Sequence, residues 1–193
     1  MDIARLDPAA YRRTPWKNGG GMTIDIADAY APGAVAGGWS GMLWRLGRTQ
    51  IVEPGPFSDL AGYDRILTVI GGRGLMLEIA GGAALDVREP FRPVRFAGED
   101  RITSRLEAGP VAVFNLMSDR EHAIDVAIMC ANDTRRLEAA THIVYAIEDS
   151  EVVIAGQAFA LRVDEALRAE QEGELTVRSG RVALSTISSR SAP

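Results

Sequence analysis

The sequence predicts an all-β protein, because apolar and polar residues alternate along many short segments and glycine-rich turns separate those segments. Alternation with a period of two is the pattern of a strand with one buried face, and it occurs at 22–26, 42–46, 75–79 and 124–128. Helix signals are weak, and the best stretch, 164–172, fits a hairpin equally well. Many short strands joined by tight turns are typical of β-barrels and β-sandwiches.

Two glycine clusters and two continuous apolar runs refine this prediction. The clusters at 71–74 and 81–82 each separate two strand segments, and glycine adopts a positive φ at little cost, so we expect a hairpin at both. The runs 66–70 and 111–116 are apolar without alternation, which predicts strands that are covered on both faces.

The 193 residues are enough for one large domain or two small ones. Asn132-Asp133 and the charged residues after them form a candidate boundary. Beyond it, the strand, glycine turn and strand of 71–85 return in a weaker form at 156–184. The sequence therefore predicts a first lobe over 1–132, with the main motifs, and a second lobe over 133–193, the two intertwined in one compact unit.

Charge and composition exclude several classes of partner. The net charge of −5 and the pI near 5.1 do not suit nucleic acid, which requires a basic surface. No apolar run is long enough to cross a membrane, and the single cysteine, Cys130, forms no internal disulfide. We therefore expect a cytoplasmic protein that binds neither nucleic acid nor membranes.

The residues for a metal site or a histidine-based catalytic triad are missing from the sequence. Its two histidines, His122 and His142, do not have the spacing of metal-binding pairs, and there is no Gly-x-Ser-x-Gly nucleophile motif. Cys130 ends an alternating strand and is interpreted as a small buried hydrophobic residue. We expect no metal and no cofactor, and these features favour a protein that holds a small polar molecule.

The segment Pro15–Thr23 is the first candidate binding site. Its three successive glycines expose backbone N–H groups, while Lys17 offers a charge, Asn18 offers a donor and an acceptor, and Trp16 offers a flat wall. A phosphate loop is not supported, because the lysine precedes the glycines instead of following them. A plain turn leading into a strand explains the same composition equally well.

Further polar residues interrupt apolar segments downstream. Arg45 must face the opposite side of its strand from Trp44, and Arg65 stands at the start of an apolar strand. Asn115 interrupts a strongly apolar run, where an unpaired amide would cost about 1–3 kcal/mol. Taken alone, surface charge explains the two arginines, and a structural hydrogen bond explains the asparagine.

Together with the segment Pro15–Thr23, these residues belong to an ordered set of motifs. The set continues with Trp44-Arg45-Leu46, Gly55–Ser58, Gly62–Arg65, Phe96–Glu99, and Phe114–Met117 with Arg120. It resembles the signature of the HutD/Ves family of bacterial proteins over the first two-thirds of the chain. The sequence departs from the usual pattern at Ile24-Asp25, where a charged pair is common, and at Leu60-Ala61, where Phe-Pro is more usual. These departures are compatible with a different ligand in the same pocket.

The resemblance implies a bicupin, with two packed small β-barrel lobes of the double-stranded β-helix type. It also implies an accessory or regulatory role in histidine utilisation, with a small acidic metabolite such as N-formylglutamate as the ligand. Carried onto this sequence, it implies ligand-binding roles for Trp16, Lys17, Asn18, Gly19, Gly20, Arg45, Phe57, Ser58, Arg65, Asn115 and Arg120. It assigns no catalytic residue.

Two alternatives remain open beside metal-independent binding. One is a metal-free enzyme acting on a small carboxylate, with Lys17, Glu99 or Asp119 as acid or base. The other is a structural module that binds a partner protein. We expect binding rather than turnover, and sheet edges leave room for a homodimer.

Overall fold

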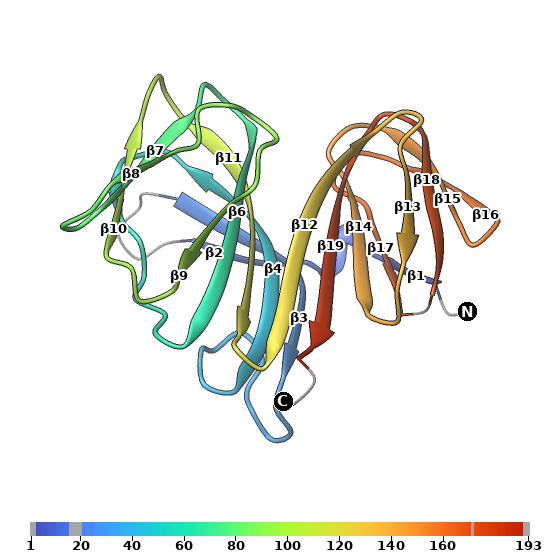
Figure 1. The fold of residues 1–193 in the computed structure, drawn as a ribbon, viewed down its shortest axis with the longest axis horizontal. Helices are drawn as coiled ribbons and strands as arrows, with labels where there is room; N and C mark the ends of the chain where they lie inside the picture. Colours follow the sequence, from blue (N-terminus) through green and yellow to red (C-terminus); the bar gives the residue numbers. More distant parts are fainter. Residues whose placement is uncertain (1–2, 16–20, 171, 191–193) are drawn as a thin grey trace. The chain divides into compact units, whose positions relative to one another are not determined.

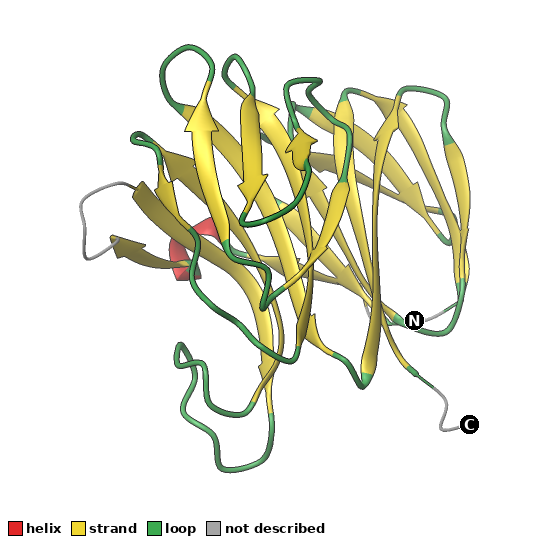
Figure 2. Cartoon of the chain, turned by 60° about the vertical axis from the view of Figure 1, so that its left-hand side comes forward, coloured by secondary structure: helices red, strands yellow, loops and turns green. Residues whose placement is uncertain are grey.

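The computed structural model describes residues 3–15, 21–170 and 172–190. Figure 2 shows strands joined by loops, with a single 3-10 turn, η1 (Pro8–Ala10), as the helical element of this part of the chain. The all-β prediction is therefore confirmed. The chain forms two compact units (Figure 1): the first is Tyr11–Glu121, and the second combines Met1–Ala10 with His122–Pro193.

The first unit contains two antiparallel sheets. The larger sheet has six strands, in the order β2 (Arg12–Pro15), β3 (Gly21–Tyr30), β4 (Met42–Ile51), β11 (Val111–Asp119), β6 (Tyr63–Gly71) and β9 (Val94–Ala97). The smaller has four, in the order β5 (Gly55–Pro56), β10 (Ile102–Leu106), β7 (Leu75–Ile79) and β8 (Ala84–Asp86). Their shared core includes Leu67 and Val113 from the larger sheet and Leu77 and Ile102 from the smaller one.

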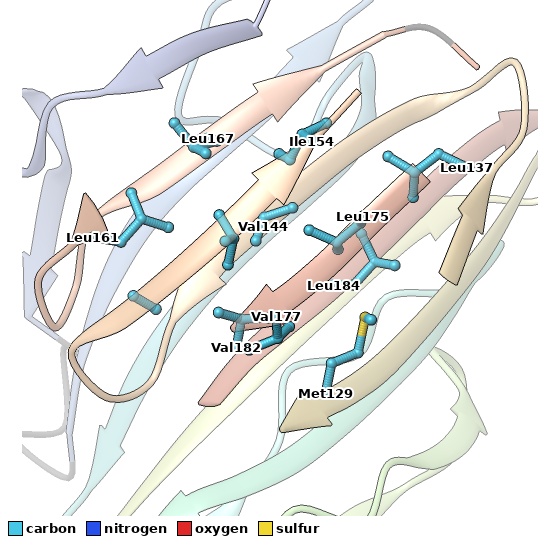
Figure 3. Close-up of a cluster of buried hydrophobic side chains, with 12 residues drawn as sticks. Met129, Leu137, Val144, Ile154, Leu161, Leu167, Leu175, Val177, Val182 and Leu184 are labelled. Atoms are coloured by element: carbon cyan, nitrogen blue, oxygen red, sulfur yellow. The ribbon is translucent and has the colours of Figure 1, made fainter. Parts of the chain in front are cut away.

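The second unit repeats this plan. Its five-stranded sheet has the order β1 (Ile3–Leu6), β17 (Ala166–Ala169), β14 (Thr141–Ala146), β19 (Arg181–Ser189) and β12 (His122–Cys130). Its four-stranded sheet has the order β13 (Thr134–Leu137), β18 (Gly173–Ser179), β15 (Ser150–Ile154) and β16 (Gln157–Leu161). Figure 3 shows the apolar side chains that both sheets contribute to the core, among them Val144, Leu175 and Leu184.

Each unit is a cupin-type jelly roll, so the expected bicupin fold is confirmed. The sheets of a unit face each other as separate layers and are not closed into barrels in the described residues. The division between the units falls between Glu121 and His122, whereas the sequence analysis placed it after residue 132. Strand β12 belongs to the second unit because it pairs along its whole length with β19.

Local predictions have mixed outcomes. The turn at 81–82 joins the paired strands β7 and β8, as expected, but the turn at 71–74 carries the chain from one sheet to the other and is not a hairpin. The described residues of the segment 164–172 contain strand β17 (Ala166–Ala169) and no helix. Cys130 is exposed, not buried, because it is the last residue of its strand. In the part of the chain that the structure describes, no helix has the length and apolar character needed to cross a bilayer.

Candidate functional site

A cavity of about 520 Å³ opens on the inner face of the six-stranded sheet in the first unit. Alternate residues of four neighbouring strands line it, because side chains two positions apart share one face of a strand. At one end of this face the inward-facing residues are mostly apolar and belong to the core. Toward the other end of the same face, polar residues take their place. The lining from these strands is Thr23 and Asp25, Arg45, Gly47, Thr49 and Ile51, Arg65 and Leu67, and Val113, Asn115 and Met117.

The strand register decides which of these residues are neighbours. Met117 on β11 stands directly between Arg45 on β4 and Arg65 on β6. On the edge of β6 that faces away from β11, Arg65 pairs with Phe96 of β9. Residues 56–58 and Leu60 complete the wall, together with Gly37 and Trp39 from the loop that joins β3 to β4.

Arg65 is a buried cation that has no countercharge in the part of the chain that the structure describes. The whole residue is 6% exposed. Within the described residues, its guanidinium has no carboxylate partner and its Nε atom has no hydrogen-bond acceptor. Instead it lies over two aromatic rings, 5.1 Å from the centroid of Phe57 and 4.9 Å from that of Phe96. Burial lowers the pKa of Arg65 to about 10, so the side chain stays protonated at neutral pH.

An unpaired charge of this kind is unusual, because buried charges in proteins are normally paired. The two rings hold the guanidinium in place and contribute about 0.5–1 kcal/mol each through cation–π attraction, without cancelling its charge. Arg65 is therefore preorganised to receive an anion from the cavity.

Arg45 is equally buried, at 7% exposure, but its surroundings are different. Its Nη2 donates to Tyr30 Oη and Gly38 O at 2.8 Å and to Gly37 O at 3.2 Å. The guanidinium also stacks on Trp39, 4.5 Å from the ring centroid. Through these contacts Arg45 holds the β3–β4 loop in place at the cavity. Its guanidinium is therefore less available to a ligand.

Asp25 balances the charge on this side of the cavity, although the sequence analysis did not select it. Its Oδ2 accepts a hydrogen bond from Arg12 Nε at 3.0 Å, and its Oδ1 lies 3.9 Å from Arg45 Nε. Arg12 also bonds to Asp28. The positive charges of Arg12 and Arg45 are thus balanced by the negative charges of Asp25 and Asp28. The available signal was the alternation of Thr23 and Asp25, which puts two polar residues on the same inward face of β3.

The remaining predicted site residues fall into three groups. Phe57, Ser58 and Asn115 line the cavity with the two arginines, and the buried Oδ1 of Asn115 has no hydrogen-bond partner among the described residues. Arg120 lies outside it on the surface, bonded to Glu99 at 2.5 Å and to Asp64 at 3.3 Å. The remaining residues that were predicted to bind a ligand lie outside the described part of the chain: Trp16, Lys17, Asn18, Gly19 and Gly20.

The histidines lie outside the cavity. His142 is buried in the second unit, with Nε2 2.9 Å from Glu138 O and Nδ1 3.1 Å from Thr186 Oγ1. Burial lowers the pKa of His142, so it is neutral at physiological pH and serves as a structural link between strands. Among the residues described, no three His, Cys, Asp or Glu side chains come together as a metal-binding group.

Comparison with known proteins connects this fold and cavity to one family. The family model HutD matches residues 8–184. An uncharacterized 21.2 kDa protein of Pseudomonas putida, from the hutC 3' region, is 39% identical over 107 residues, which make up 55% of this chain and 53% of that protein. The match thus spans about half the length of that relative.

Two solved structures are similar over nearly the whole chain. HutD from Pseudomonas fluorescens SBW25, in a formate condition, is 31% identical with a TM-score of 0.81, and the match covers 98% of this chain and 100% of that one. The conserved protein of unknown function PA5104 from Pseudomonas aeruginosa PAO1 is 28% identical with a TM-score of 0.86, at the same coverage. The chain therefore belongs to the HutD family, which is linked to histidine utilisation.

Proposed function

We propose that the cavity of the first unit binds a small acidic metabolite without a metal ion, and that Arg65 is the group that holds its carboxylate. The observation that carries this proposal is the buried, positively charged Arg65, which has no countercharge among the described residues and lines the cavity. A carboxylate placed against it would supply the missing partner.

The energetics favour such a ligand. A charge-assisted hydrogen bond contributes roughly 1.5–3 kcal/mol when well formed, and a guanidinium offers two in parallel to a carboxylate. Phe57 and Phe96 already hold the side chain in position, so little conformational entropy is lost on binding. Ser58 and Asn115 are polar neighbours in the same lining and would orient the acid.

An acid of the N-formylglutamate type, in an accessory or regulatory protein of histidine utilisation, is the finer form of the same proposal. Family membership supports the connection with histidine utilisation. The cavity volume of about 520 Å³ leaves ample room for an acid of this size.

The test is ligand binding by calorimetry and thermal melting, with formate, glutamate and N-formylglutamate, in the presence of a chelator. At about a hundred times its dissociation constant, a bound acid stabilises the protein by roughly 2.7 kcal/mol, which raises the Tm at about 2–4 °C per kcal/mol. Arg65→Met removes the charge and keeps a long side chain against the two rings. Arg120→Met is the matched control, because that arginine lies outside the cavity.

We expect binding in the wild type and in Arg120→Met, and its loss in Arg65→Met. Binding that persists in Arg65→Met would refute the assigned role of Arg65, and the failure of every acid to bind would refute the proposed function. Consumption of the bound acid would show that the protein is an enzyme.

A further inference from the structure

The loop that joins β3 to β4, residues 31–41, has no buried residue and carries no charge. Figure 1 shows it projecting beyond the ends of the two strands. Its two large apolar side chains are exposed, Val35 at 80% and Trp39 at 48%. The loop therefore adds little to the core of the first unit, and its position depends on a few polar contacts. Segments with so few buried contacts open locally at low cost in free energy.

Tyr30 and Arg45 hold this loop against the cavity. Arg45 donates hydrogen bonds to the carbonyl oxygens of Gly37 and Gly38, and its guanidinium stacks on Trp39. The hydroxyl oxygen of Tyr30 accepts two hydrogen bonds at 2.8 Å, one from Gly37 N and one from Arg45 Nη2. This hydroxyl thereby bridges the loop and the arginine. We call these contacts the Tyr30–Arg45 latch.

Trp39 lies at the mouth of the cavity. It lines the cavity and is half exposed to solvent, so its side chain separates the two. A second segment with exposed lining residues is 56–58. Trp39 stacks on Arg45 and Phe57 stacks on Arg65, and these arginines belong to the two strands that flank β11. The two rings therefore stand over opposite sides of β11.

We propose that this loop is a gate: an acid passes beside Trp39, and the hydroxyl of Tyr30 sets how often the passage opens. Gly33 and Gly41 flank the moving residues, with φ angles of 83° and 72° that favour glycine. Small residues at the ends of a loop commonly serve as its hinges. The inference rests on the proposed function and adds to it the way in which the acid enters and leaves.

A gate of this kind has a kinetic signature. Tyr30 is absent from the described lining, so it holds the loop without touching the acid. Loss of its hydroxyl weakens the latch equally in the empty and in the occupied protein. The rates of association and dissociation then rise by the same factor, and the dissociation constant, which is their ratio, stays constant. A residue that contacts the acid changes the dissociation constant instead.

The variant Tyr30→Phe tests this signature, because it removes the hydroxyl and keeps the ring. N-formylglutamate and formate are the probes. Each has one C–H proton on its formyl or formate carbon, and NMR exchange spectroscopy of that proton measures dissociation, while calorimetry gives the dissociation constant. We expect both rates to rise about fivefold at an unchanged dissociation constant, which corresponds to the loss of about one net hydrogen bond.

Tyr145→Phe is the matched control. It removes a tyrosine hydroxyl that is bonded to Asp164 in the second unit, so both rates should keep their wild-type values. A second variant, Trp39→Ala, removes the wall itself. We expect dissociation at least as fast as in Tyr30→Phe, and no further acceleration when the two substitutions are combined, because an absent wall needs no opening.

Wild-type rates in Tyr30→Phe, or effects of the two substitutions that simply multiply, would overturn the gate and leave the proposed function standing. Faster dissociation with a matching loss of affinity would also overturn it, since Tyr30 would then act on the bound acid. If neither probe binds to the wild type, the proposed function fails and the gate fails with it.

Discussion

Replacing Arg65 by methionine should make the ligand-free protein more stable while abolishing its binding of acids. Burial lowers the pKa of Arg65 to about 10, and at about 1.36 kcal/mol per pH unit this shift disfavours its charged form by about 3 kcal/mol. Cation–π attraction to Phe57 and Phe96 offsets about 1–2 kcal/mol of this. Methionine is apolar and flexible enough to pack against the two rings in place of the guanidinium.

The expected net gain is therefore about 1–2 kcal/mol, or a rise in Tm of roughly 2–8 °C. The assay is thermal and urea unfolding of the ligand-free protein at pH 7, followed by tryptophan fluorescence. This signal reports on the first unit, because Trp39 and Trp44 both belong to it.

Arg45→Met is the matched comparison, a second buried arginine on the same inward face. Its removal frees the carbonyls of Gly37 and Gly38 and takes one cation from Asp25, so we expect it to destabilise the protein by about 3 kcal/mol. If Arg65→Met is instead destabilised by as much as Arg45→Met, the guanidinium of Arg65 has a compensating partner and the reasoning is refuted.

Two further predictions concern pH and packing. Arg65 is protonated below its pKa of about 10, so the affinity for formate should be constant between about pH 6 and 9 and should fall about tenfold per pH unit above about 10. Calorimetry at a series of pH values measures this affinity. A loss of affinity with its midpoint below about pH 9 would contradict the prediction. Gly98→Ala should destabilise the protein by about 3 kcal/mol, because a Cβ there would lie 2.0 Å from Leu60 O, whereas Gly55→Ala, with nothing within 4 Å, should unfold at nearly the wild-type temperature.

Much of the fold could be predicted from the sequence, because a strand with one buried face leaves a period of two in its own residues. The same periodicity places Arg45 on one face of its strand together with Gly47 and Thr49, which is how these residues come to share a cavity. The turn at 71–74 was predicted incorrectly, since glycine marks a change of direction but does not say which sheet the next strand joins.

The tertiary structure alone decided which of the two buried arginines has a countercharge among the described residues. Both carry the same charge and both are buried, and nothing in their local sequence distinguishes them. Pairing of β3 with β4 brings Asp25 next to Arg45, and pairing of β6 with β9 brings Phe96 next to Arg65. Arg45 thereby has a countercharge, whereas Arg65 has none among the described residues. Alternation along a strand determines the face of each side chain, but only the pairing of strands distant in sequence determines its neighbours.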